Sequence, residues 1–273
     1  MSLPLFPATE DPGPSFTDLL RRTGGPPAVP SGAAGWSEPG HGPTGPVTHG
    51  TTVLAMRYAD GILMAGDRRA TAGHDIAHRT VEKLFPADSH SGVCFAGAAS
   101  PAIEMVRLFQ TQLEHYEKVE GVALSLEGKA NQLGQMIRQN LPMAMQGFVV
   151  VPLYAGYDLR RQGGRIFTYD PSGGPYEERD FQTTGSGGRD ARTAIKMVYR
   201  DDMDRAHAIE VAVQALYEAA DEDTATGGPD VIRGIYPTVA TITAEGFERV
   251  PEPEVGESFS ALIERRTASG GRV

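Results

Sequence analysis

The chain has 273 residues, of which 40% are hydrophobic and 22% are charged, a composition typical of one large globular domain or two small ones. Its formal net charge of -10 argues against binding to nucleic acid or to an anionic membrane surface, because like charges repel. No apolar stretch approaches the roughly 20 residues needed to span a bilayer. Cys94 is the single cysteine, which excludes an intrachain disulfide and fits a reducing, cytoplasmic location.

Residues 1–50 differ in composition from the rest of the chain. They contain ten of the twenty prolines and nine glycines, and they lack the basic head of a secretory signal. Such a segment cannot bury enough apolar area to offset the entropy lost on ordering. We expect extended or disordered chain here, with one or two helical turns at residues 15–22. Composition alone favours a flexible tail or linker.

From residue 51 onward the pattern becomes that of a folded domain. Residues 52–58 and 62–65 form two nearly all-apolar runs joined by an Asp-Gly turn. These runs predict a β-hairpin in a sheet that is covered on both faces. Short strands are expected next at about 75–81, 83–85 and 92–95.

The apolar period then changes from that of a strand to that of a helix. Ser100 and Pro101 predict a helix start, with a capping hydroxyl and a proline in the first turn. A second helix is expected from Leu126 to Leu141, ending near Pro142. Further along the chain we expect strands at 148–157, 165–169 and 238–243, and helices at 190–199, 206–220 and 259–266.

This order of elements predicts an α+β fold. Hairpins followed by pairs of helices do not make alternating βαβ units, which argues against a Rossmann-type parallel sheet. Two mostly antiparallel sheets packed face to face, with helix pairs outside, satisfy the pattern of buried strands better. The sequence therefore predicts a four-layer αββα sandwich.

The junction between the two parts of the chain reads Gly50-Thr51-Thr52. Glycine does not shield its carbonyl, so cleavage after Gly50 would leave Thr51 with a free α-amine. An α-amine has a pKa near about 8. It can therefore take the proton from the Thr51 hydroxyl and activate it as a nucleophile. A threonine that merely begins a strand is the simpler interpretation of this tripeptide taken alone.

Motifs further along the chain change that balance. Thr51-Thr52, Gly66-Asp67-Arg68-Arg69 and Lys83 resemble, in residue type and spacing, the mature start of 20S proteasome β subunits. Three further motifs of the family occur in the expected order, and the resemblance spans nearly all of residues 51 to about 245. The Gly-Gly-Pro-Asp run and the proline-rich N-terminal segment are most similar to the actinobacterial type. The further motifs are Gly97-Ala98-Ala99, residues 184–187 and residues 223–228.

The resemblance implies the N-terminal-nucleophile hydrolase fold, with residues 1–50 as a removable prosegment and 51–273 as the catalytic domain. It implies that Thr51 is the nucleophile, that Lys83 is a nearby cation, and that Asp67 pairs with Lys83. It also implies an oxyanion donor at the Gly97 backbone. The residues implied to form a polar network around the Thr51 amine are Ser186, Asp223 and Thr226, the last standing where the family often has serine.

The resemblance further implies where substrate binds. The backbone of Thr71 and Ala99 would pair with an extended peptide. An uncharged, partly aromatic specificity pocket predicts cleavage after apolar residues, and its expected members are Ala70, Val81, Phe85, Phe95, Ala99 and Ile103.

The implied reaction is peptide-bond hydrolysis through an acyl ester on Thr51, with no cofactor and no required metal. His74 and His78 are only a pair at i, i+4, without the spacing of a metal site. The implied partners are six like β subunits in a seven-membered ring, a ring of α subunits, an ATP-driven unfoldase and unfolded protein substrates.

Several other interpretations stay open at this point. One is the two-component heat-shock threonine peptidase of bacteria. The others are a catalytically silent ring subunit and an N-terminal-nucleophile amidohydrolase acting on a small molecule. Locally, Asp67 and Lys83 could be a surface ion pair, the Gly-rich stretch around Ser186 could cradle phosphate, and residues 221–223 could be a solvated acidic helix end.

Overall fold

The computed structural model describes residues 50–72 and 75–268. All of these lie in one compact unit, Gly45–Val273. The prosegment expected at residues 1–49, with its helical turns at 15–22, lies outside the described residues, as does His74.

The first of two five-stranded sheets carries the start of the folded domain. Its order is β10-β1-β2-β11-β12, and every neighbouring pair is antiparallel. All six residues of β2 are buried, as expected for a sheet covered on both faces. The strands are β1 (Thr52–Tyr58), β2 (Gly61–Gly66), β10 (Phe181–Gly185), β11 (Thr238–Thr243) and β12 (Gly246–Arg249).

The second five-stranded sheet follows chain order, β5-β6-β7-β8-β9, and is also antiparallel throughout. A separate two-stranded ribbon pairs β3 (Ala70–Ala72) with β4 (Asp75–His78). The strands of the second sheet are β5 (Leu84–Asp88), β6 (Ser91–Gly97), β7 (Val150–Asp158), β8 (Gly163–Tyr169) and β9 (Pro175–Glu178).

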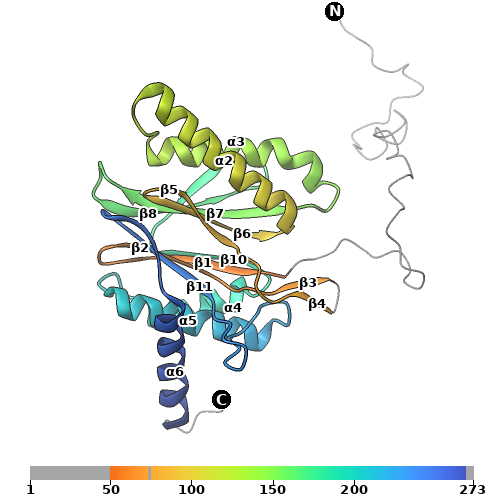
Figure 1. The fold of residues 1–273 in the computed structure, drawn as a ribbon, viewed down its shortest axis with the longest axis vertical. Helices are drawn as coiled ribbons and strands as arrows, with labels where there is room; N and C mark the ends of the chain where they lie inside the picture. Colours follow the sequence, from red (N-terminus) through yellow and green to blue (C-terminus); the bar gives the residue numbers. More distant parts are fainter. Residues whose placement is uncertain (1–49, 73–74, 269–273) are drawn as a thin grey trace, which may run out of the picture. The chain divides into compact units, whose positions relative to one another are not determined.

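The helices cover the outer faces of the two sheets (Figure 1). Helices α2 (Ala99–Glu120) and α3 (Leu126–Ala144) pack on the second sheet, and α4 (Gly188–Val198) and α5 (Arg205–Glu222) pack on the first. Helix α6 (Glu252–Ala268) packs against α5. The predicted αββα sandwich of the α+β class is confirmed.

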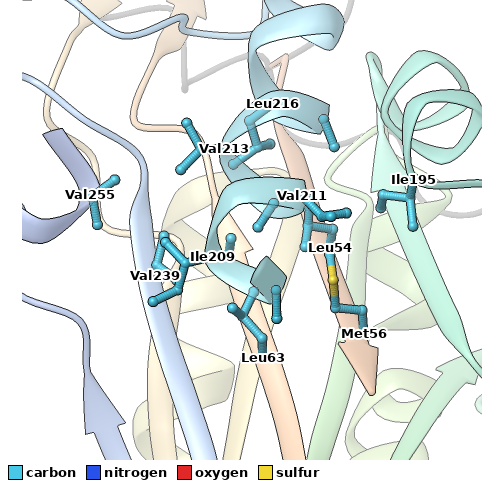
Figure 2. Packing of buried hydrophobic residues seen from close by; sticks show 14 of the residues in the cluster. Leu54, Met56, Leu63, Ile195, Ile209, Val211, Val213, Leu216, Val239 and Val255 are labelled. Atoms are coloured by element: carbon cyan, nitrogen blue, oxygen red, sulfur yellow. The ribbon is translucent and has the colours of Figure 1, made fainter. Parts of the chain in front are cut away.

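Three buried clusters correspond to the three interfaces between these layers. Leu54, Met56 and Leu63 point from the first sheet toward Ile209 and Leu216 of α5 (Figure 2). A second cluster joins α2 and α3 to the second sheet. A third lies between the two sheets and includes the fully buried Cys94. Both faces of each sheet are therefore packed, which holds the strand ends rigidly in place.

The predicted start of helix α2 is wrong, whereas α3 ends near Pro142, as predicted. Helix α2 begins at Ala99 with Ala98 as its N-cap and no side-chain cap, so Ser100 lies inside the first turn. The Ala98 N–H instead donates to the carbonyl of Val149, 2.8 Å away, so the segment that leads into β7 positions this helix start. Helix α3 continues past Pro142 to Ala144, because a proline near the C-terminus removes only one backbone hydrogen bond.

Candidate active site

Thr51 directly precedes β1, whose neighbours in the sheet are β2 and β10. Its side chain is buried, with 3% of the residue exposed. The Ser186 N–H donates to the Thr51 carbonyl at 2.9 Å. Gly185, directly before Ser186, has a φ of +106°, and a Cβ there would lie 1.7 Å from that carbonyl oxygen. Glycine at 185 is therefore required for β10 to approach Thr51.

Asp67 and Lys83 form a buried ion pair beside Thr52. Lys83 Nζ lies 2.7 Å from Asp67 Oδ1, and the two side chains are 3% and 0% exposed. Asp67 Oδ1 also accepts from the Thr52 N–H at 2.8 Å. Its Oδ2 accepts from the backbone N–H of Arg69 at 2.9 Å and of Gly227 at 2.8 Å. All of its acceptor positions point to groups around the strand start, so a solvated surface pair is excluded.

Lys83 is held in a fixed position by two acceptors. Besides Asp67, its Nζ donates to the backbone carbonyl of Arg69 at 2.5 Å. Burial lowers the pKa of Lys83 below its usual value, and the neighbouring Asp67 carboxylate opposes that shift. Burial therefore makes Lys83 more ready to release its proton than an exposed lysine would be.

A second polar group reaches the Thr51 nitrogen from the other side. The Thr51 N–H donates to Ser186 Oγ at 3.3 Å, and Ser186 Oγ donates to Asp223 Oδ2 at 2.5 Å. Thr226 Oγ1 donates to the same carboxylate oxygen at 2.6 Å. The structure thus brings together the three side chains of the expected network, from β10 and from the loop that follows α5.

Asp223 is held as a carboxylate. Burial by itself would raise its pKa, but hydrogen bonds from Ser186 and Thr226, with those from two backbone N–H groups, bring the pKa below its usual range. Asp223 directly follows the end of α5 and caps the next turn, since its Oδ1 accepts from the Ala225 N–H at 3.1 Å. It therefore serves as an acceptor for the network and not as a solvated helix end.

Gly50 sits against the nucleophile candidate and the same loop. The Thr51 hydroxyl donates to the Gly50 carbonyl at 2.7 Å, and the Gly50 N–H donates to Thr71 Oγ1 at 3.3 Å. A Cβ at position 50 would lie 1.8 Å from the Ala225 Cβ. A residue larger than glycine therefore cannot take this position without moving the loop.

Gly97, the expected oxyanion donor, ends β6 with a φ of +100°. A Cβ there would meet the Val149 carbonyl oxygen at 2.2 Å, so both backbone conformation and space require glycine.

The expected pocket residues are only partly collected in one place. Phe85 and Phe95 stack with ring centroids 5.9 Å apart, and both belong with Ile103 to the cluster under α2. Ala70 and Thr71 are buried in β3, while Val81 and Ala99 are half-buried. Phe95 is 2% exposed, so without a substrate it acts as a core residue.

Four residues around the site were not identified from the sequence. Thr52 Oγ1 lies 2.6 Å from Thr226 Oγ1. The N–H groups of Gly187 and Gly227 donate to Thr52 Oγ1 and to Asp67 respectively. The Arg69 guanidinium donates to the Thr224 carbonyl at 2.8 Å and so ties the first hairpin to the loop after α5. The repeated threonine and the glycine runs were visible, but their partners lie more than a hundred residues away.

Among the described residues, no cluster of three or more His, Cys, Asp or Glu side chains is arranged to hold a metal ion. No helix in the same part of the chain is both long and apolar enough to cross a membrane.

Comparison with known proteins identifies the family. The model of the family described as Proteasome subunit matches residues 47–233. A protein named Proteasome subunit beta from Acidimicrobium ferrooxidans is 58% identical over 273 residues, covering 100% of this chain and 97% of the relative. Relatives of the same name from Acidothermus cellulolyticus and Streptomyces griseus are 55% and 56% identical over 82% and 80% of this chain, and 79% and 78% of their own lengths.

Proposed function

Because this chain belongs to the proteasome subunit family and is a threonine endopeptidase of the β type, we propose that Thr51 is its nucleophile, freed when the Gly50–Thr51 bond is cut. Residues 1–50 are then a prosegment and 51–273 the catalytic domain. One observation carries this proposal. The Thr51 hydroxyl donates a hydrogen bond to the Gly50 carbonyl, while the Thr51 backbone nitrogen lies 3.3 Å from Ser186 Oγ.

The mature reaction uses the amine that the cut creates. With a pKa near about 8, a neutral fraction of that amine is present at neutral pH and can accept the Thr51 hydroxyl proton. The Thr51 Oγ then attacks the substrate carbonyl, the peptide C–N bond breaks, and the leaving amine takes the proton held by the Thr51 amine. Water hydrolyses the acyl ester that remains and restores the Thr51 hydroxyl. Lys83 favours the neutral amine when it is charged, and Asp67 fixes the Lys83 side chain.

The network of Ser186, Asp223 and Thr226 orients the nitrogen of Thr51. Ser186 Oγ can accept from the nitrogen because its own proton is directed to Asp223. Gly97 is proposed to donate its backbone N–H to the oxyanion.

The first cut differs from later turnovers because the Thr51 nitrogen is still an amide and cannot accept a proton. Another group must therefore take the hydroxyl proton at that stage. Lys83 is suited to this role because burial lowers its pKa. Hydrogen bonds connect Lys83 Nζ to Asp67 and Asp67 to the backbone N–H of Thr52, whereas the Thr51 hydroxyl donates to the Gly50 carbonyl. To take the hydroxyl proton, Lys83 would have to be neutral and reach that hydroxyl.

Substrate recognition is assigned to the apolar residues of the expected specificity pocket. Phe85, Phe95 and Ile103 offer an uncharged wall, with Ala70, Val81 and Ala99 as small or apolar neighbours. We propose cleavage after apolar residues, with the peptide backbone paired to Thr71 and Ala99. Fluorogenic peptides that differ only in the residue before the scissile bond test this, and faster cleavage after acidic or basic residues would contradict it.

As a proteasome β subunit, the chain assembles with α subunits into the core particle. The proposed arrangement is a seven-membered β ring of like subunits beside a ring of α subunits, fed with unfolded protein by an ATP-dependent unfoldase. A closed chamber would keep the activated Thr51 nucleophile away from cellular protein. The single cysteine supports a cytoplasmic location. Electron microscopy tests this assembly: sevenfold symmetry would support it, and sixfold symmetry would favour a heat-shock peptidase. The names of the relatives do not favour the heat-shock peptidase.

The decisive experiment is co-expression with the α partner, followed by intact mass measurement of the wild type and of Thr51→Ala. We expect the wild type to lose residues 1–50 and the variant to keep them. Thr241→Ala, which removes a buried hydroxyl elsewhere in the same sheet, should be processed like the wild type. Full-length wild type in assembled, inactive particles would instead make the chain a silent ring subunit.

A further inference from the structure

We propose that Thr52 is a positioning residue for the threonine reaction, acting through its buried hydroxyl on Thr226 and thereby on Asp223. This proposal rests on the proposed role of Thr51 and adds a residue to which the sequence pattern gave no function. Thr52 is 0% exposed, so its polar atoms must find partners within the protein.

The partners of Thr52 fix the direction of each hydrogen bond. The Gly187 N–H donates to Thr52 Oγ1 at 3.0 Å. Thr226 has a single hydroxyl proton, and it is directed to Asp223. The contact of 2.6 Å between the two threonine hydroxyls must therefore have Thr52 as the donor and Thr226 as the acceptor.

This order makes a relay that ends on one oxygen. It runs from the Gly187 N–H through Thr52 and Thr226 to Asp223 Oδ2. The other branch, from the Thr51 nitrogen through Ser186, ends on the same oxygen. Thr226 and Ser186 thus donate to the same oxygen of Asp223. By fixing the Thr226 hydroxyl, Thr52 helps to set the position of that carboxylate.

Thr52 also joins the two halves of the site. Its backbone N–H donates to Asp67, which holds Lys83, while its side chain holds Thr226. Asp67 in turn accepts from the Gly227 N–H, next to Thr226. These three hydrogen bonds, together with the Thr226–Gly227 peptide bond, close a ring that connects Asp67, Thr52, Thr226 and Gly227. The contact between the hydroxyls of Thr52 and Thr226 is the part of this ring that depends on the Thr52 side chain.

The two hydroxyls are fully buried and lie close to the backbone of Gly187. A Cβ on Gly187 would lie 2.7 Å from both the Thr52 and the Thr226 hydroxyls. Loss of the Thr52 hydroxyl would therefore leave the Gly187 N–H and the Thr226 oxygen without this partner in a buried place, and Thr226 would be free to turn.

The test compares Thr52→Val with Thr52→Ser in assembled, full-length particles. Valine keeps the shape and removes the hydroxyl, while serine keeps the hydroxyl. We expect Thr52→Val to slow prosegment removal and to lower kcat about 10- to 100-fold, with KM within about 2-fold of the wild type. Thr52→Ser should restore both rates. Thr241→Val is the control for loss of a buried hydroxyl, and it should match the wild type.

A double-mutant cycle shows whether Thr52 acts through Thr226. If it does, Thr52→Val in a Thr226→Val background should cost almost nothing further in kcat. Equal and additive losses would overturn the proposal, as would wild-type rates in Thr52→Val. If Thr52→Val does not assemble, Thr52→Ser and Thr52→Ala carry the same comparison, since they differ only in the hydroxyl.

The test of Thr52 can fail without the proposed role of Thr51 failing, and the two results can be told apart. Processed, active wild type together with unaffected Thr52→Val would overturn the role of Thr52 alone. Wild type that keeps residues 1–50 would overturn both proposals.

Discussion

Two charged clusters in this molecule are built in opposite ways. Around Asp67 the ion pair with Lys83 is almost fully buried, and three of the four donors to the carboxylate are backbone N–H groups. Around Arg165 on β8 the partners are side chains. Arg165 bonds Glu177 through two nitrogens at 2.8 and 2.5 Å, and Asp158 lies 3.2 Å away.

The partners of Arg165 are also closer to water, with Glu177 42% and Asp158 12% exposed. Side chains near solvent can rearrange and are screened by salt, so such a cluster contributes modestly to stability and little to geometry. Backbone donors cannot rearrange without moving strands. The comparison indicates that the Asp67 cluster defines positions of atoms, whereas the Arg165 cluster only holds two strands and a loop together.

The largest expected effect is that of Asp67→Asn. All groups around Asp67 are donors, so an amide NH₂ would face a donor on at least one side. We expect kcat/KM to fall about 10³-fold and stability to fall by about 3 to 5 kcal/mol per chain. Fluorogenic peptide kinetics and thermal unfolding of the particle at fixed protein concentration measure these.

Asp158→Asn is the matched control in the Arg165 cluster. It makes the same chemical change, and we expect kcat/KM within about 2-fold of the wild type because nothing links Asp158 to Thr51. Equal losses in the two variants would break the contrast between the clusters.

Gly187→Ala extends the comparison to the backbone. Its new methyl group would press on the hydroxyls of Thr52 and Thr226 at 2.7 Å, and small-to-large changes of this kind cost about 1 to 3 kcal/mol. We expect slower prosegment removal and kcat/KM lowered about 10- to 100-fold. Gly163→Ala, beside Arg165 on β8, meets its nearest atom at 4.0 Å and should leave both rates unchanged.

Arg165→Met should affect stability and leave activity intact. Arg165 is 8% exposed, so its loss removes a buried cation from Glu177 and leaves Asp158 only its longer ion pair with Arg161 among the described residues. We expect a loss of about 1 to 2 kcal/mol that narrows in 1 M salt. Melting curves at low and high salt measure it, and a change in kcat/KM would show that this cluster reaches the active site.

The smallest expected effect is a pH dependence of that difference in stability. Hydrogen bonds from Arg165 lower the pKa of Glu177 in the folded chain, although burial opposes this. A lowered carboxylate pKa stabilises the fold above the unfolded value of about 4.3, and this contribution is lost as pH falls through the folded value. The gap in melting temperature between wild type and Arg165→Met should therefore shrink below about pH 4. A gap that widens with acid would contradict this sign.

The sequence by itself determined the layers of the fold and the motifs in which the candidate catalytic residues lie. Apolar runs with strand or helix period specify which faces are buried, and this depends on neighbouring residues only. Asp67 directly follows β2, and Lys83 comes sixteen positions later. Both residues therefore lie in one short stretch, in which the family pattern could identify them. The start of α2 was predicted less well, because the carbonyl of Val149, distant in sequence, and not the Ser100 hydroxyl positions it.

Only the tertiary structure decided which polar atoms meet around Thr51. Thr52 and Thr226 are separated by 174 positions, and nothing in either local pattern selects the other as its partner. Their hydroxyls meet because two packed sheets and α5 fix the start of β1 against the loop after α5, which buries both groups completely. A buried hydroxyl without a partner costs free energy. The sequence therefore supplies the hydroxyl groups, and the packing of distant elements determines which of them form hydrogen bonds with each other.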